Sequence, residues 1–124
     1  MKVDVRTFKD SKVLSRAAAK MFIRAAVEAI DVRGRFLVAL SGGGTPSGLH
    51  RLLATRPYRD QIDWSNTFVF WGDERCVPPD DPSSNYHQAM DTLLSYVPIL
   101  DENIQRIKGE LEPAEASMDY VRIL

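Results

Sequence analysis

The sequence predicts an α/β fold with a largely parallel sheet and helices on both faces. Strand-like and helix-like segments alternate along the chain, and two continuous apolar runs, Phe36–Leu40 and Thr67–Trp71, stand between turn signals. A loop rich in glycine or charge follows each run. Apolar runs of this kind are typical of strands buried on both faces, and 124 residues are enough to bury one core.

Residues 3–8 alternate apolar and polar side chains, which predicts a short opening strand. Asp10 or Ser11 can cap a helix that runs to about Ile30, and Gly34 supplies its stop. One face of this helix is charged and is expected to be solvated: Lys12, Arg16, Lys20, Arg24 and Glu28. The expected apolar stripe comprises Leu14, Ala18, Met21, Phe22, Ala25 and Ala29.

The later elements continue the alternation. Pro46 opens a helix after the first apolar run, and residues 76–84, which contain three prolines, form a stiff loop after the second. Ser83 or Ser84 starts the next helix. A short strand is expected near 104–107, and a last helix begins near Pro113.

Composition argues against several classes of function. A formal net charge of -1 is unlike that of a nucleic-acid-binding protein, which normally shows a basic excess. No apolar run approaches the roughly 20 residues needed to cross a bilayer, and the first residues have no apolar signal core. The single cysteine, Cys76, fits a reducing compartment. We therefore expect a cytoplasmic protein that binds neither nucleic acid nor membrane.

The first candidate site is the glycine loop Ser41 to Thr45. Its three glycines allow a sharp turn and a close approach of the backbone to a ligand. The helix that follows presents free N–H groups and a positive dipole end, which suit phosphate. The loop matches neither the dinucleotide fingerprint nor the nucleoside-triphosphate loop. The flanking hydroxyls of Ser41 and Thr45 favour contact with a phosphate or a sugar over a plain turn.

The second candidate site is Asp73-Glu74-Arg75, which also follows an apolar run. Because ligands bind at the carboxyl ends of strands in open α/β sheets, this segment is expected beside the glycine loop. A carboxylate there could bind sugar hydroxyls or accept a proton, and an arginine could hold phosphate. The alternative is a solvated turn in which Glu74 pairs with Arg75, and the residues alone do not decide between the two.

The histidines and the cysteine carry weaker signals. His50 and His87 each lie on a predicted helix and have no second histidine or cysteine at metal-ligand spacing, so we expect no metal site. Each histidine is expected to be a surface or packed helix residue rather than a catalytic base. Cys76 has no base beside it in sequence and is interpreted as structural.

Four segments become specific when they are taken together in order. They are LSGGGTP at 40–46, IDW at 62–64, FWGDERCVP at 70–78 and DPSSNY at 81–86. This series resembles the N-terminal half of the 6-phosphogluconolactonase family, within the glucosamine-6-phosphate isomerase/6-phosphogluconolactonase superfamily. The proline loop and its Ser-Asn-Tyr are the most diagnostic part, and the resemblance covers nearly the whole chain.

The resemblance implies a modified Rossmann-like fold and hydrolysis of 6-phosphoglucono-δ-lactone to 6-phosphogluconate, in the oxidative pentose phosphate pathway. It implies that the protein needs neither a metal nor an organic cofactor. It also implies that the binding partner is a small-molecule sugar phosphate. The substrate-binding residues that we expect from it, together with the residue chemistry, are Gly42, Gly43, Gly44, Thr45, Asp73, Arg75 and Asn85.

The same resemblance implies that part of the site is missing. Family members are roughly twice as long, and their general-base histidine lies in a Gly-Pro-Asp-Gly-His type segment of the second half. No such segment occurs here, and neither His50 nor His87 matches it. The last predicted helix also reaches Leu124 without a cap. Residues 1–124 are therefore expected to be the N-terminal part of a single lactonase/isomerase-type domain, truncated, inactive alone, and without an identifiable catalytic residue.

Two other functions stay open. One is a sugar-phosphate isomerase or deaminase of the same fold, although those enzymes usually have Met-Asp-Glu-Tyr where this sequence has Gly72-Asp73-Glu74-Arg75. The arginine favours the lactonase. The other is a non-enzymatic module that binds a sugar phosphate. The oligomeric state cannot be read from the sequence.

Overall fold

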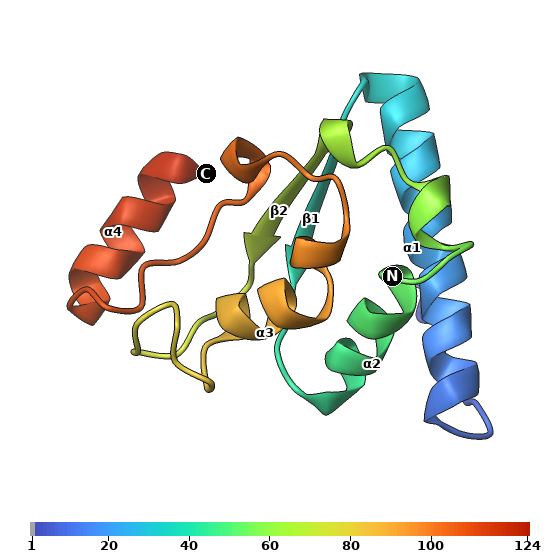
Figure 1. The fold of residues 1–124 in the computed structure, drawn as a ribbon, viewed down its shortest axis with the longest axis horizontal. Helices are drawn as coiled ribbons and strands as arrows, with labels where there is room; N and C mark the ends of the chain where they lie inside the picture. Colours follow the sequence, from blue (N-terminus) through green and yellow to red (C-terminus); the bar gives the residue numbers. More distant parts are fainter. Residues whose placement is uncertain (1) are drawn as a thin grey trace.

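The computed structural model describes residues 2–124, in which a two-stranded parallel sheet lies between α1 on one side and α4 on the other in the view of Figure 1. The α/β class with a parallel sheet is thereby confirmed. The helices and strands are α1 (Ser11–Arg33), β1 (Phe36–Leu40), α2 (Gly44–Leu53), β2 (Thr67–Trp71), α3 (Asn85–Thr92) and α4 (Pro113–Ile123). Short 3-10 turns lie at Arg59–Gln61, Trp64–Asn66, Leu94–Tyr96 and Asp101–Asn103. None of the helices in the described part of the chain is long and apolar enough to span a membrane.

Helix α1 begins and ends where its capping residues predict. The Asp10 side chain accepts a hydrogen bond from the Val13 N–H at 2.9 Å, and Gly34 adopts a left-handed φ of 78° at the other end. The predicted charged face is exposed, but the predicted apolar stripe is partly wrong, because Met21 and Ala25 are exposed. The side chains that pack into the core are instead Ala19, Phe22, Ile23, Ala26, Ala29 and Ile30.

The two strands pair in parallel with their carboxyl ends level. Register runs from Phe36 opposite Thr67 to Leu40 opposite Trp71. Both strand predictions are confirmed in extent. The expectation that Phe36–Leu40 is buried on both faces is wrong, because Leu37 is 52% exposed and only the alternate side chains enter the core. Leu37 and Ala39 point to the same face of β1, and both are exposed in the described structure.

The other two strand predictions do not hold as made. Residues 2–7 have no regular structure, and Val3 and Val5 are exposed, since an alternating pattern forms a strand only when its backbone pairs with a sheet, and these residues pair with neither β1 nor β2. Near 104–107 there is a single parallel bridge, Val69 with Ile104, in place of a strand. The Gln105 N–H donates to the Val69 carbonyl at 2.8 Å, so this bridge covers the second edge of β2.

The core lies where α1, α2 and α3 meet the strands, and its largest fully buried side chains include Trp64, Leu53 and Leu93. Helix α3 is attached there through Ala89 and Leu93, while its N-terminus reaches the carboxyl ends of the strands. Ser84 caps it by accepting the His87 N–H at 3.1 Å, as the sequence predicts. The predicted proline loop and the helix at Pro113 are also confirmed.

Candidate functional site

Both candidate loops leave the same end of the sheet. The glycine loop follows Leu40 and the Asp73-Glu74-Arg75 segment follows Trp71, which is paired with Leu40. The Gly72 N–H donates to the Leu40 carbonyl at 3.3 Å, so the strands are still joined where the loops begin. The expected placement at neighbouring carboxyl ends is therefore found, and it brings the main chains of the two segments together.

Asn85, the first residue of α3, connects the two loops. Its side-chain Nδ2 lies 3.3 Å from the Asp73 carbonyl and 3.4 Å from the Asp73 carboxylate. The same amide is packed against Gly42, where a Cβ atom would overlap it. Glycine at position 42 is thus required by this close approach, and buried Asn85 holds the glycine loop and Asp73 at one place.

Gln88 lies one helical turn after Asn85 on the same face of α3 and contacts the next glycine. The Gly43 N–H donates to Gln88 Oε1 at 3.1 Å, and Gln88 Nε2 donates to the Gly43 carbonyl at 2.9 Å. Gly43 has a φ of 107°, which only glycine adopts readily, and it is the N-cap of α2. The α3 helix therefore holds the glycine loop by two side chains.

Glu74 anchors the N-terminus of α3. Its carboxylate accepts the N–H groups of Asn85 at 2.7 Å and Tyr86 at 3.0 Å, and the Ser84 hydroxyl at 2.9 Å. It also accepts the Arg75 N–H at 2.8 Å. A carboxylate at the positive end of a helix dipole is favourable, and here it satisfies donors that the helix itself leaves free. The solvated Glu74–Arg75 ion pair considered from the sequence is not formed.

Arg75 is exposed, and the contacts that fix it in place are made by its backbone and not by its side chain. The Val77 N–H donates to the Arg75 carbonyl at 2.8 Å, and Gly109 packs so closely against this carbonyl that a Cβ atom there would clash with it. Within residues 2–124, the guanidinium makes neither an ion pair nor a hydrogen bond. Its positive charge is therefore available to a ligand.

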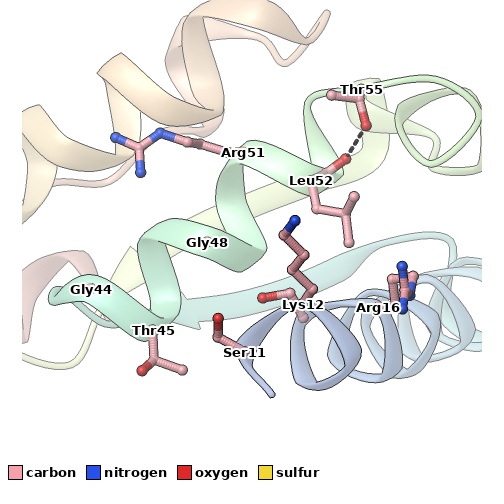
Figure 2. A pocket seen from close by; sticks show the side chains of 10 residues that line it. Ser11, Lys12, Arg16, Gly44, Thr45, Gly48, Arg51, Leu52 and Thr55 are labelled. Atoms are coloured by element: carbon pink, nitrogen blue, oxygen red, sulfur yellow. Dashed lines mark hydrogen bonds between the residues drawn. The ribbon is translucent and has the colours of Figure 1, made fainter. Parts of the chain in front are cut away.

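Although the two loops begin side by side, within residues 2–124 they line separate cavities and not one shared cleft. Gly44 and Thr45 border a cavity of about 630 Å³ between α1 and α2. Residues 72–76 border another, of about 440 Å³, against α4. In Figure 2, Lys12 extends from α1 toward α2 beside the first cavity, whereas Arg51 points away. Arg51 Nη1 is bound to the Ser47 hydroxyl at 2.7 Å.

The histidines have the packed positions expected of them. His50 is 2% exposed on α2, and burial lowers its pKa from 6.5 to about 4, so it is neutral at pH 7. His87 is half-buried on α3. Cys76 is an exposed free thiol. Over residues 2–124, no group of three or more His, Cys, Asp or Glu side chains could hold a metal ion.

A sequence model of the family described as "Glucosamine-6-phosphate isomerases/6-phosphogluconolactonase" matches residues 9–124. The chain belongs to this family. Two curated relatives are named 6-phosphogluconolactonase: that of Haemophilus influenzae is 50% identical over 76 residues, and that of Mycobacterium tuberculosis 41% over 128. These alignments cover 61% and 98% of this chain. A crystal structure named devB protein superposes with a TM-score of 0.85 at 35% identity.

Relative to these family members the chain is short. It spans 33% of the Haemophilus protein and 51% of the Mycobacterium protein, and its fold covers 48% of the devB chain while 95% of its own residues are matched. The chain corresponds to the N-terminal part of a 6-phosphogluconolactonase-family protein. The candidate site described above therefore lies within the part of the family fold that this chain spans.

Sequence reasoning missed three residues whose hydrogen bonds hold the elements around the candidate site. Glu74 was considered as part of a candidate ligand site or of a solvated charged turn, but not as an anchor for a helix, although a carboxylate facing the start of a helix is a recognisable anchor once Ser84 is placed as its cap. Gln88 was not considered, although it lies three residues after Asn85 and therefore shares its helix face. A third residue, Tyr120 on α4, accepts the Trp71 N–H and donates to the Gln105 carbonyl, both at 2.9 Å.

Proposed function

We propose that this chain is the substrate-binding N-terminal half of an enzyme that hydrolyses 6-phosphoglucono-δ-lactone to 6-phosphogluconate. The reaction belongs to the oxidative pentose phosphate pathway, and we place it in the cytoplasm. The proposal assigns substrate contact to the glycine loop, to Asp73 and Arg75, and in part to Asn85. It assigns the general base to the half of the domain outside residues 1–124.

One observation carries this proposal: α3 clamps the glycine loop and the Asp73 segment together at neighbouring carboxyl ends of parallel strands. An open α/β sheet binds its ligands at this position. The lactonase name of relatives that are 41% and 50% identical supports the reaction class. The family description also includes isomerases, and Arg75 in place of the tyrosine expected in those enzymes favours the lactonase.

The geometry suits a division of labour between the loops. Gly44 and Thr45 are the first residues of α2, so their N–H groups have no acceptor within the helix and lie at its positive end. These N–H groups are therefore suited to bind the phosphate of the substrate. Asp73 presents an exposed carboxylate to sugar hydroxyls, and the free guanidinium of Arg75 can pair with an anionic part of the substrate.

The chemistry needs one further group. Opening a lactone requires a water activated by a base of near-neutral pKa and donors that stabilise the developing oxyanion. The phosphate, remote from the ester, anchors the ring so that the water and the carbonyl carbon meet in a reactive geometry. His50 does not meet the requirement for a near-neutral base, because burial lowers its pKa to about 4.

The proposal is tested by binding. The ¹⁵N-labelled chain is titrated with 6-phosphogluconate, and amide shifts are expected in both loops, 41–45 and 73–75, with a common saturation curve. Glucosamine 6-phosphate, the substrate type of the deaminase alternative, is expected to bind more weakly. Shifts confined to one loop, or tighter binding of the amino sugar, would contradict the lactonase assignment.

A further inference from the structure

Gln88 is the side chain that holds the turn between β1 and α2. Its amide makes two hydrogen bonds to one residue, accepting the Gly43 N–H at 3.1 Å and donating to the Gly43 carbonyl at 2.9 Å. Few side chains can do this, because the pair requires a donor and an acceptor on one planar group. Both polar atoms of the amide are thereby occupied.

The turn depends on this support because α2 lacks the usual one. Its N-cap is Gly43, which has no side chain to accept an N–H of the first turn. Gly43 also has a φ of 107°, in a region that glycine leaves easily in either direction. The Gly43 carbonyl accepts the Ser47 N–H at 3.1 Å, which is the first backbone hydrogen bond of α2. The same carbonyl accepts the hydrogen bond from Gln88.

We propose that Gln88 is a positioning residue, which fixes the peptide of Gly43 and so aims the N–H groups of Gly44 and Thr45 at the phosphate of the substrate. This inference rests on the proposed function. Gln88 acts through the loop and not by touching the ligand, since its Oε1 and Nε2 both bind Gly43. A pre-oriented loop binds more tightly because less conformational freedom is lost when the ligand arrives.

The experiment compares Gln88→Met and Gln88→Glu with the full 124-residue chain. Met keeps the length of the side chain but makes neither hydrogen bond, and Glu keeps the acceptor for the Gly43 N–H but loses the donor. Gln61→Met is the matched control, because Gln61 is an exposed glutamine whose amide donates to a loop carbonyl, that of Pro57, at 3.1 Å. Circular dichroism at 15 °C establishes which variants are fully folded.

Two readouts separate positioning from simple stabilisation. The first needs no ligand: ¹⁵N relaxation is expected to show increased mobility of 42–45 in Gln88→Met and not in Gln61→Met. The second is the affinity for 6-phosphogluconate at 15 °C, expected to fall by roughly tenfold in Gln88→Met, as for two lost hydrogen bonds. Gln88→Glu is expected to bind at least as weakly, because its charge lies beside the anion.

The outcomes are distinct. Unchanged mobility of 42–45 in Gln88→Met overturns the inference, and so does a mobile loop with unchanged affinity. If the unmutated chain fails to bind 6-phosphogluconate, the proposed function fails, whereas the relaxation result still decides whether Gln88 orders the loop. Loss of both loop order and affinity in a folded Gln88→Met chain, with Gln61→Met unaffected, establishes the role.

Discussion

His50 is a buried base without a hydrogen-bond partner at its Nδ1 atom. Burial lowers its pKa from 6.5 to about 4, so the folded chain resists a proton that the unfolded chain accepts. Below pH 6.5 the unfolded state therefore binds more protons, and stability falls as the pH falls from about 6.5 to about 4. This loss amounts to at most about 3 kcal/mol.

The test is a comparison with His50→Leu, which has no titrating group. Urea unfolding midpoints are measured from pH 7.5 to pH 4. The free energy of unfolding of the unmutated chain should decline more steeply over this window than that of the leucine variant. Parallel pH profiles would mean that another group, and not His50, controls acid stability.

Arg75 offers a free guanidinium beside Asp73, and its loss should be felt by an anionic ligand. We expect Arg75→Ala to weaken the affinity of the chain for 6-phosphogluconate by about fivefold, a modest effect because the side chain is exposed. The control is Arg35→Ala, an exposed arginine immediately before β1, at the opposite end of the strands. Equal affinities of the two variants in a calorimetric titration would show that Arg75 is only a solvated turn residue.

At the level of single residues, the sequence shows which functional groups are present but not which atoms they contact. The glycines at 42–44 and the segment Asp73-Glu74-Arg75 stand out because they follow apolar strands. The contacts of Glu74 and Gln88 arise from α3, which comes later in the chain and reaches back across the sheet end. The Ser84 cap and the spacing of Gln88 from Asn85 are local signals, but the residues that Glu74 and Gln88 contact are far away in sequence, so the fold is needed to identify these partners.

At the scale of elements, Glu74 determines how α3 is attached. Its carboxylate accepts three hydrogen bonds from the start of α3, so Glu74→Ala leaves the N–H groups of Asn85 and Tyr86 without an acceptor. We expect a loss of about 2 kcal/mol in the free energy of unfolding. Glu74→Gln, which keeps one acceptor oxygen, should lose less.

The control for this prediction is Glu115→Ala, which removes an exposed glutamate from the first turn of α4. It should change stability by no more than about 0.5 kcal/mol. Urea unfolding followed by tryptophan fluorescence gives both values. If the two alanine variants were equally stable, the anchoring contacts of Glu74 would have no energetic weight.

Helix α4 is tied to the sheet by one hydroxyl. Tyr120 accepts the Trp71 N–H and donates to the Gln105 carbonyl, and its ring is buried. Tyr120→Phe removes both bonds and leaves a buried N–H without a partner, which should destabilise the chain by about 1–2 kcal/mol. Tyr96→Phe, at a 57% exposed position, should have no measurable effect on the thermal midpoint. A neutral Tyr120→Phe would mean that the two hydrogen bonds of this hydroxyl contribute nothing to holding α4.

The elements themselves were predicted unevenly, for physical reasons. Caps are local, so Asp10, Gly34 and Ser84 marked helix ends correctly. The apolar stripe of α1 is displaced, because small alanines can face either the core or solvent and carry little periodic signal. Residues 3–8 had the pattern of a strand, but they pair with neither β1 nor β2, and alternation by itself does not select a pairing partner.

For the whole molecule, the parallel α/β arrangement followed from the alternation of segments, whereas its incompleteness shows in burial. Leu37 lies inside β1, yet it is half exposed, and over residues 2–124 β2 gains a single bridge beyond its pairing with β1. A strand rich in apolar residues normally buries both faces. The two candidate loops likewise border separate cavities in the described residues.

At this scale we expect the 124-residue chain to bind 6-phosphogluconate but to show no lactone hydrolysis above the spontaneous rate. His50 is buried and neutral with a pKa of about 4, and the family's base segment is absent from this sequence. Without a base, assistance worth roughly 10²–10⁴-fold is lost, although the loops can still hold the phosphate. The assay follows lactone opening with the spontaneous reaction subtracted, and the Mycobacterium tuberculosis relative serves as the positive control. Turnover comparable to that control would mean either that His87 is the base or that two copies of the chain together complete a site. If the activity survived in His87→Gln, assembly of the site from two copies would be the remaining explanation.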